Sequence, residues 1–243
     1  MPELAAADSS GRYIGDELEL FQHANNWKAY MRRSLAPFIA GAVAEVGAGI
    51  GGTTAALAGL PGVTNWLCVE PDPAQAAIIS GRIERGELPG HCRALCGTLA
   101  GLRRDEPLDA VLYIDVLEHI DDDRGELRDA AAVLRTGGRI VVLAPAYQFL
   151  FSPFDAAVGH HRRYTLRSLR NVRPDGMTER AGFYLDSMGL LASLANKLLL
   201  KQRQPTVKQV QTWDRRIVPL SVMLDPLVRR RLGRSAVIVW EKP

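Results

Sequence analysis

The sequence predicts an α/β protein built around a mainly parallel sheet, and three observations carry this prediction. Short apolar stretches alternate with helical stretches between residues 42 and 144, which is the pattern of repeated β-α-β units. The first apolar stretch runs into a glycine cluster, Gly47 to Gly52, of the form G-x-G-x-x-G. The chain has 243 residues and is therefore long enough to bury a full core.

The predicted elements follow one another regularly as far as residue 144. Residues 20–38 carry apolar side chains at spacings of three and four, which predicts a helical segment that packs onto the body. Strands are expected over residues 42–46, 66–69, 91–95, 108–114 and 139–144, and helices over 53–60, 74–85 and 126–134. Ligands bind beyond the carboxyl ends of the strands in such sheets.

Beyond residue 144 the alternation stops. A long connection over residues 146–163 is rich in aromatic and basic side chains, and long ordered loops in compact domains usually have a function. Thr165 is expected to cap a short helix over 166–171. The remaining predictions are a strand over 183–187, a helix over 189–201, helical pieces over 209–231 and a last strand over 235–240.

Composition limits the class of protein. Hydrophobic residues make up 47% of the chain, but no stretch approaches the roughly twenty apolar residues that span a bilayer. The N-terminus does not have the pattern of a secretory signal, and the three cysteines form no even disulfide framework. We therefore expect a cytoplasmic protein. His91, Cys92 and Cys96 lack a fourth ligand at zinc-like spacing, so no metal is expected.

Charge is distributed unevenly along the chain. From His160 onward there are 17 Lys/Arg and 6 Asp/Glu, a balance of +11, whereas the preceding part has 13 and 21, a balance of −8. A basic C-terminal third suits an anionic substrate or surface, or is a solvated face that pairs with local acids. Nucleic acid is not expected, because the arginines are dispersed. The leucine-rich stretch 190–199 is expected in the core, with peripheral membrane contact as the alternative.

Glu70 is the candidate for binding a ribose. It lies 23 positions past Gly47, close to the roughly twenty at which an acid follows the glycine loop. A carboxylate accepts two hydrogen bonds from a vicinal diol. A nicotinamide-dependent oxidoreductase would share this pattern. However, Glu45 interrupts the apolar strand before the glycines, and a long helical segment precedes the strand.

Four stretches in order resemble the class I S-adenosylmethionine-dependent methyltransferases of the broad type 11/12 group. They are Glu45-Val-Gly-Ala-Gly-Ile-Gly, Val69-Glu-Pro-Asp, residues 109–120 and residues 134–143. Residues 154–164 also resemble a sub-family with a Gly-His-x-Arg-Arg-Tyr element. The resemblance implies a Rossmann-like, seven-stranded, mostly parallel sheet whose last strand, 235–240, is antiparallel and lies beside strands 139–144 and 183–187.

The resemblance covers roughly residues 20–243 and implies one methyltransferase domain over 16–243 after a flexible tail, 1–15. Within the domain, residues 16–40 are expected to form a helical lid and residues 41–145 the cofactor-binding half. Residues 146–234 are then the acceptor-side insertion, and 235–243 contain the last strand. The implied cofactor is S-adenosylmethionine, with S-adenosylhomocysteine as the product.

The resemblance also assigns residues to each end of the cofactor. At the methionine end, Gly47-Ala48-Gly49 approaches the ligand, and Glu45 holds the amino group through water. Asp115 and Val116 lie by the sulfonium.

At the adenosine end, Glu70 takes the ribose hydroxyls and Pro71 packs near the adenine. Many relatives have an acid after the third strand, whereas this chain has Gly97-Thr98. The Thr98 hydroxyl or the backbone N–H of Leu99 is expected to take its place.

Methyl transfer from a sulfonium needs an acceptor that is positioned away from water. A hydroxyl acceptor would also need a base, for which His119 and His160 are the candidates. Tyr147, His160, Arg163 and Tyr164 are expected to form the acceptor-side wall, since an arginine fork matches an anionic group. The alternative is that salt bridges tie this segment to the body.

We therefore expect an enzyme that methylates oxygen or nitrogen of a small-molecule acceptor, which could be anionic. The protein is expected to be a monomer or a homodimer. The alternatives are a non-catalytic cofactor-binding interaction protein and an NAD(P)-dependent oxidoreductase.

Overall fold

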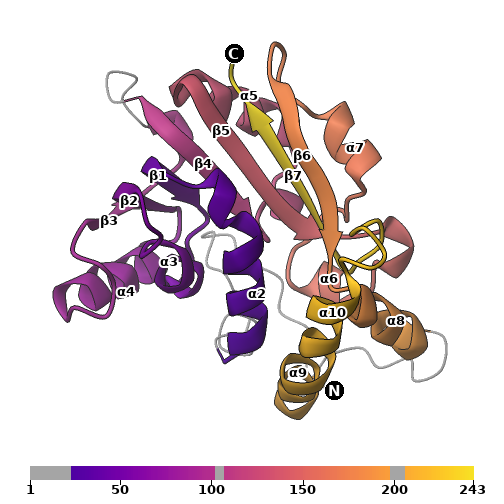
Figure 1. Ribbon diagram of the computed structural model, residues 1–243. Helices are drawn as coiled ribbons and strands as arrows, with labels where there is room; N and C mark the ends of the chain where they lie inside the picture. Colours follow the sequence, from indigo (N-terminus) through magenta and orange to yellow (C-terminus); the bar gives the residue numbers. More distant parts are fainter. Residues whose placement is uncertain (1–22, 102–106, 198–205) are drawn as a thin grey trace.

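The computed structural model describes residues 23–101, 107–197 and 206–243 (Figure 1). Its centre is a seven-stranded sheet in the order β3-β2-β1-β4-β5-β7-β6. β7 runs antiparallel to both of its neighbours, so the predicted fold class and the place and direction of the last strand are confirmed. The expected tail over residues 1–15 lies outside the described residues. The strands are β1 (Gly41–Val46), β2 (Val63–Glu70), β3 (Cys92–Cys96), β4 (Leu108–Ile114), β5 (Leu134–Pro145), β6 (Thr178–Leu185) and β7 (Ser235–Glu241).

Helices cover both faces of the sheet, and each face has its own apolar core. The first core includes residues of α2 (Asn25–Leu35), α3 (Gly52–Leu57), α4 (Pro73–Glu84), α9 (Val207–Thr212) and α10 (Val218–Leu224). The second includes residues of α5 (Asp123–Val133) and α7 (Leu166–Asn171). In Figure 1, α6 (Pro153–Ala157) and α8 (Ser187–Ala195) lie beyond the carboxyl ends of the parallel strands.

The strand predicted over 183–187 is wrong in its bounds, because β6 ends at Leu185 and α8 begins at Ser187. Asp186 lies between them with a φ of 66°, and its side chain accepts a hydrogen bond from the N–H of Gly189. A left-handed residue does not continue a strand, and an aspartate in this place caps the helix that follows.

The strand predicted over 139–144 also begins earlier than expected, because residues 134–138 belong to β5. The Gly137 N–H donates to the carbonyl of Lys242 (2.8 Å), and the Lys242 N–H donates to the carbonyl of Gly138 (2.9 Å). Pairing with the end of the chain therefore extends the strand through a glycine pair that would otherwise turn.

The helical pieces predicted over 209–231 form one run in which α9, the π-helical η6 (Trp213–Ile217) and α10 follow without a gap. Pro219 lies in the first turn of α10, where its missing N–H is not needed. The cap predicted for α7 is confirmed, because Thr165 Oγ1 accepts a hydrogen bond from the Ser168 N–H at 3.1 Å.

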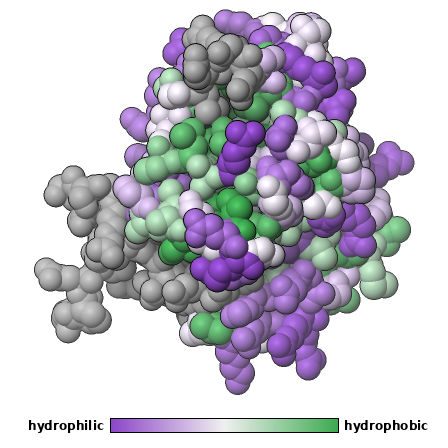
Figure 2. Space-filling view, turned by 90° about the vertical axis from the view of Figure 1, so that its left-hand side faces the viewer, coloured by the Kyte–Doolittle hydropathy of each residue, from purple (hydrophilic) through white to green (hydrophobic). Residues whose placement is uncertain are grey.

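The surface shows no single apolar face from the side that carries β3 and α4, where hydrophilic and hydrophobic residues are interspersed (Figure 2). In the leucine-rich stretch, Leu190 is buried but Leu191 is 55% exposed, and residues 198–199 lie outside the described residues. None of the described helices is both long enough and apolar enough to cross a membrane.

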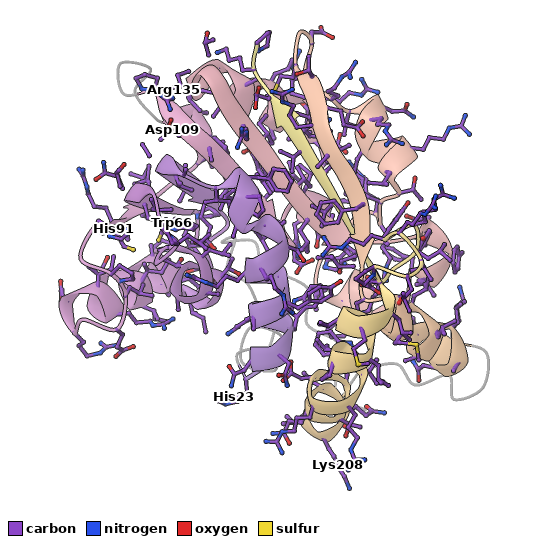
Figure 3. The ribbon with its side chains drawn as sticks, in the orientation of Figure 1. His23, Trp66, His91, Asp109, Arg135 and Lys208 are labelled. Carbon is purple, nitrogen blue, oxygen red and sulfur yellow. The ribbon has the colours of Figure 1, made fainter. Side chains whose placement is uncertain are left out.

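The sheet has its switch point between β1 and β4, because the chain goes from β1 to β2 on one side and returns to β4 on the other. Ligands bind at such a point in open α/β sheets, beyond the carboxyl ends of the strands. Asp109 and Arg135 form an ion pair at the opposite, amino end of β4 (Figure 3). The predicted site residues belong to the other edge of the sheet, where the parallel strands have their carboxyl ends.

Candidate functional site

The turn after β1 depends on glycine. Gly47, Gly49 and Gly51 have φ values of 64°, 58° and 78°, in the left-handed region that favours glycine. A Cβ on Gly47 would lie 2.7 Å from Cγ2 of Val116. The turn therefore brings the end of β1 into close contact with the residue that follows Asp115 after β4.

Glu70 ends β2 and holds the glycine turn from the side. Its Oε2 accepts a hydrogen bond from the Gly49 N–H at 2.8 Å, and its Oε1 accepts one from the Asp72 N–H at 3.0 Å. Burial raises the pKa of Glu70, although the two hydrogen bonds oppose this shift. A carboxylate has more than two acceptor positions, so the anchored side chain retains capacity to accept from a ribose diol.

We expect Glu70→Gln to weaken S-adenosylmethionine binding by about 10- to 100-fold, because a hydrogen bond to a charged group contributes roughly 1.5–3 kcal/mol. Isothermal titration calorimetry of the two proteins measures this loss. Glu84→Gln, at an exposed position on the end of α4, is the matched control. Equal affinities of the two variants would contradict the assignment of Glu70.

Glu45 lies in β1 on the face that α3 covers. Its Oε2 accepts hydrogen bonds from Thr54 Oγ1 (2.5 Å) and from the Nε1–H of Trp66 (2.9 Å), which is labelled in Figure 3. Burial raises the pKa of Glu45 to about 7. The carboxyl group thus joins β1 to β2 and to the first turns of α3, and its implied contact with the cofactor stays a prediction.

Asp115 is exposed directly after β4 and has a φ of 54°. Its backbone N–H donates to the carbonyl of Leu143 in β5 at 2.8 Å, which fixes this conformation. Non-glycine residues held in the left-handed region are uncommon and cluster at functional sites. An acid is therefore presented at the switch point, beside Val116 and Gly47.

The residues expected near the adenine lie along the same edge. Pro71 and Thr98 are exposed, after β2 and β3 respectively. Leu99 begins the short helix η2 (Leu99–Gly101), and its side chain is buried in the second core. The Gly97 N–H donates to the carbonyl of Glu70 at 3.0 Å, so these two loops are tied together.

The two histidines predicted to be catalytic lie together. His119 ends the short helix η3 (Leu117–His119), and its ring packs edge-to-face on that of His160, with the centroids 4.6 Å apart. His160 Nδ1 lies 2.9 Å from Asp155 Oδ1. Burial, followed by the charges of the neighbouring histidines, lowers the pKa of His119 to about 4, so its ring is neutral at pH 7.

Glu118 completes this cluster and is fully buried. One ligand atom each from Glu118, His119 and His160 lies within 4.8 Å of the others. Ligand atoms bound to one ion at about 2.1 Å would lie roughly 3.4 Å apart. The group would therefore have to contract before it could hold a metal.

The arginine side chains that follow His160 pair with aspartate side chains of the same protein. Arg163 Nε and Nη2 donate to the two oxygens of Asp155 at 2.8 and 2.9 Å. Tyr164 is buried, and its hydroxyl donates to Asp123 Oδ2 at 2.8 Å. Arg162 Nη1 also donates to Asp123 Oδ2 of α5 at 2.9 Å, and this ion pair agrees with the alternative in which salt bridges tie the segment to the body.

Tyr147 lies in an aromatic stack. Its ring stacks on Tyr184 and on Phe149, in each case with the centroids 5.3 Å apart. Its N–H donates to the carbonyl of Tyr164 at 2.8 Å. Tyr147 and Tyr164 are thus linked through the backbone, and the acceptor-side role of the predicted residues stays a prediction.

Sequence reasoning missed Asp155, which joins His160, Arg163 and Ser152. The signal was present, since Ser152 and Asp155 form a capping box at the start of α6. Asp123 was missed for a similar reason, because an acid in the first turn of α5 has the appearance of a residue that complements the helix dipole.

The described part of the predicted lid is α2 with the short helix η1 (Ala36–Phe38). The N–H of Trp27 donates to Asp214 Oδ1 at 2.8 Å, and the hydroxyl of Tyr30 donates to Asp225 Oδ2 at 2.6 Å. The N-terminal helix is thus anchored to η6 and to the end of α10.

A solvent-open hollow of about 400 Å³ lies between α2 and α3, lined in part by Lys28.

Residues 44–142 match the Methyltransf_11 family model, which is described as a methyltransferase domain. The search of curated proteins gave no match.

The chain is similar to several solved structures over most of its length. One is a complex between the Haloferax volcanii Trm112 methyltransferase activator and the putative methyltransferase (15% identity, TM-score 0.66, 98% of this chain and 99% of that chain). A second is an S-adenosylmethionine-dependent methyltransferase from Clostridium acetobutylicum (10%, 0.58, 93% and 95%). A third is the N-methyltransferase NodS from Bradyrhizobium japonicum in complex with S-adenosylhomocysteine (15%, 0.55, 99% and 95%).

These findings agree with the geometry at the carboxyl edge of the sheet. The matched residues contain the glycine turn, Glu70 and Asp115, and one of the similar structures, NodS, is in complex with S-adenosylhomocysteine. Residues 44–142 thus match the model of a methyltransferase domain, within a chain that has the Rossmann-like methyltransferase fold.

Proposed function

We propose that the protein transfers a methyl group from S-adenosylmethionine to oxygen or nitrogen of a small-molecule acceptor. The observation that carries this proposal is the convergence of the glycine turn, the Glu70 carboxylate and Asp115 at one switch point. S-adenosylmethionine supplies an activated methyl group whose leaving sulfide needs no proton. The residues therefore have to bind the cofactor, orient the acceptor and exclude water.

The residues at the switch point fit this cofactor. The contact between Gly47 and Val116 leaves no room for a Cβ, so only a bare backbone lies where the methionine moiety would approach. Glu70 is held by the Gly49 and Asp72 N–H groups, which direct a carboxylate toward the ribose position.

On the acceptor side we propose His160 as the residue that takes a proton from the acceptor. A base acts best when a third group orients it, and Asp155 Oδ1 lies 2.9 Å from His160 Nδ1. His119 is neutral and lies against the His160 ring, so we assign it to hydrogen bonding with the acceptor.

We propose that Arg163 and Tyr164 are positioning residues. Each already has a carboxylate partner, Asp155 and Asp123 respectively. A contact with an anionic acceptor would cost them these partners, whereas the present contact of Arg163 holds Asp155 beside His160.

Parallel calorimetric titrations with S-adenosylmethionine and with NAD(P)H test the proposal, followed by a screen of hydroxyl and amine acceptors for release of S-adenosylhomocysteine. We expect binding of S-adenosylmethionine only, and turnover with at least one acceptor. Binding of the nicotinamide cofactor alone would establish the oxidoreductase alternative. Binding of S-adenosylmethionine with no turnover across the screen would favour the non-catalytic alternative.

A further inference from the structure

α10 presents apolar side chains to solvent as well as to the core. Val218 and Ser221 are buried against the body, whereas Leu220, Met223 and Leu227 are 46%, 70% and 77% exposed. The exposed residues recur at spacings of three and four, which places them on one side of a helix. The helix therefore has apolar side chains on its exposed side as well as on its buried side.

The exposed residues continue past the end of α10. The Val228 N–H donates to the carbonyl of Leu224 at 3.1 Å, so the helical path extends beyond the helix proper. Single exposed apolar residues are normal on soluble proteins, whereas a gathered set often marks an interaction site. We call this set the α10 surface; it consists of Leu220, Met223, Leu224, Leu227, Val228 and Leu232.

The α10 surface is held firmly to the body. The Met188 N–H of α8 donates to Ser221 Oγ at 3.1 Å. The Tyr184 N–H of β6 donates to the carbonyl of Arg230 at 2.8 Å. Its exposure is therefore a property of the folded protein and does not come from a loosely placed helix.

Positive charge accompanies the α10 surface. Both acidic residues between positions 207 and 240 are buried. Asp214 accepts a hydrogen bond from the Trp27 N–H and Asp225 accepts one from the Tyr30 hydroxyl. The exposed basic residues beside the α10 surface are Arg215, Arg216, Arg229 and Arg231.

The combination of apolar and basic residues selects among the candidate occupants. A second copy would bring the same arginines together across a two-fold interface, where like charges repel. Apolar side chains that enter the headgroup region, with arginines drawn to anionic headgroups, are the signature of a helix that lies on a membrane. We propose that the α10 surface docks the protein on an anionic lipid membrane.

The position of the α10 surface determines which edge of the sheet would face a membrane. α8 and α10 lie beyond the carboxyl ends of the parallel strands (Figure 1), at the edge that carries the candidate site. Docking would therefore bring this edge toward the bilayer. It does not depend on the proposed methyl transfer.

Flotation of the full chain with lipid vesicles tests the proposal. We expect binding to vesicles of phosphatidylcholine with phosphatidylglycerol, and much weaker binding to phosphatidylcholine alone. The double variants Met223→Ser/Leu227→Ser and Arg216→Gln/Arg231→Gln should each weaken binding by about tenfold or more. Ile78→Ser, which changes a 46% exposed residue on α4, is the control and should bind like the wild type.

The proposal is overturned if the wild type does not float with the anionic vesicles, or if both double variants float as well as the wild type. It is also overturned if light scattering shows a dimer that Met223→Ser/Leu227→Ser dissociates, because the α10 surface would then be a self-association interface. Calorimetry with S-adenosylmethionine on the same samples keeps a failure of docking distinct from a failure of the proposed function.

Discussion

Asp155→Ala is expected to lower the free energy of unfolding by about 3–5 kcal/mol, the range for breaking a buried ion pair on one side. Asp155 is fully buried and accepts two hydrogen bonds from Arg163. Burial raises the pKa of this carboxyl group, but the hydrogen bonds from His160 and Arg163 outweigh it and hold the pKa well below its usual range. Without Asp155, the largely buried Arg163 loses its partner and α6 loses its capping box.

Urea unfolding followed by circular dichroism measures this loss. Asp121→Ala is the matched control, because Asp121 pairs with Arg162 from the same segment but has a side chain that is 87% exposed. An exposed ion pair contributes about 0–1 kcal/mol, so this variant should unfold close to the wild type. If both substitutions cost equally little, Asp155 does not hold the segment together.

The strands in the first part of the sheet could be predicted because several of them are nearly continuous apolar runs, whereas the place of the last strand was implied by the family resemblance. β4 and the second half of β5 are buried along almost their whole length, as the sequence suggests for strands covered on both faces. A predicted strand boundary is wrong where the backbone conformation of one residue ends the strand. Asp186 ends β6 by its left-handed backbone, and no composition or periodicity reports such a conformation.

The candidate site was predictable to the extent that its residues follow strands. Glu70 and Asp115 end or follow β2 and β4, and the parallel sheet brings them to one edge. The pairing of Arg163 could not be predicted from its residue type. Its residue type suits an anion, but the anion is Asp155, eight positions earlier, and the fold of the intervening chain decides that pairing.

Glu45→Gln is expected to remove a pH dependence of stability that amounts to about 3–4 kcal/mol in the wild type. Burial raises the pKa of Glu45 from 4.5 to about 7, and each pKa unit corresponds to roughly 1.4 kcal/mol. The folded chain thus binds this proton more tightly than the unfolded chain. Stability is therefore full below the unfolded pKa and is lost as the pH rises through the folded pKa.

Urea unfolding between about pH 5 and about pH 8 measures the effect as the difference between wild type and variant. The Gln amide oxygen still accepts from Thr54 and Trp66, so the variant should be the more stable protein at the upper end. Glu84→Gln, at an exposed position, should follow the wild type at every pH. A difference between wild type and Glu45→Gln that stays constant over this range would show that Glu45 is ionised throughout.

The same variant separates the two roles considered for Glu45. If the carboxylate holds the amino group of S-adenosylmethionine through water, Glu45→Gln weakens cofactor binding because the charge is lost. If it only joins β1, β2 and α3 through Trp66 and Thr54, binding is unchanged while the pH dependence disappears. The structural role is carried by Oε2, whose two hydrogen bonds come from buried side chains of the core, so a loss of cofactor affinity in the variant would add the first role to the second.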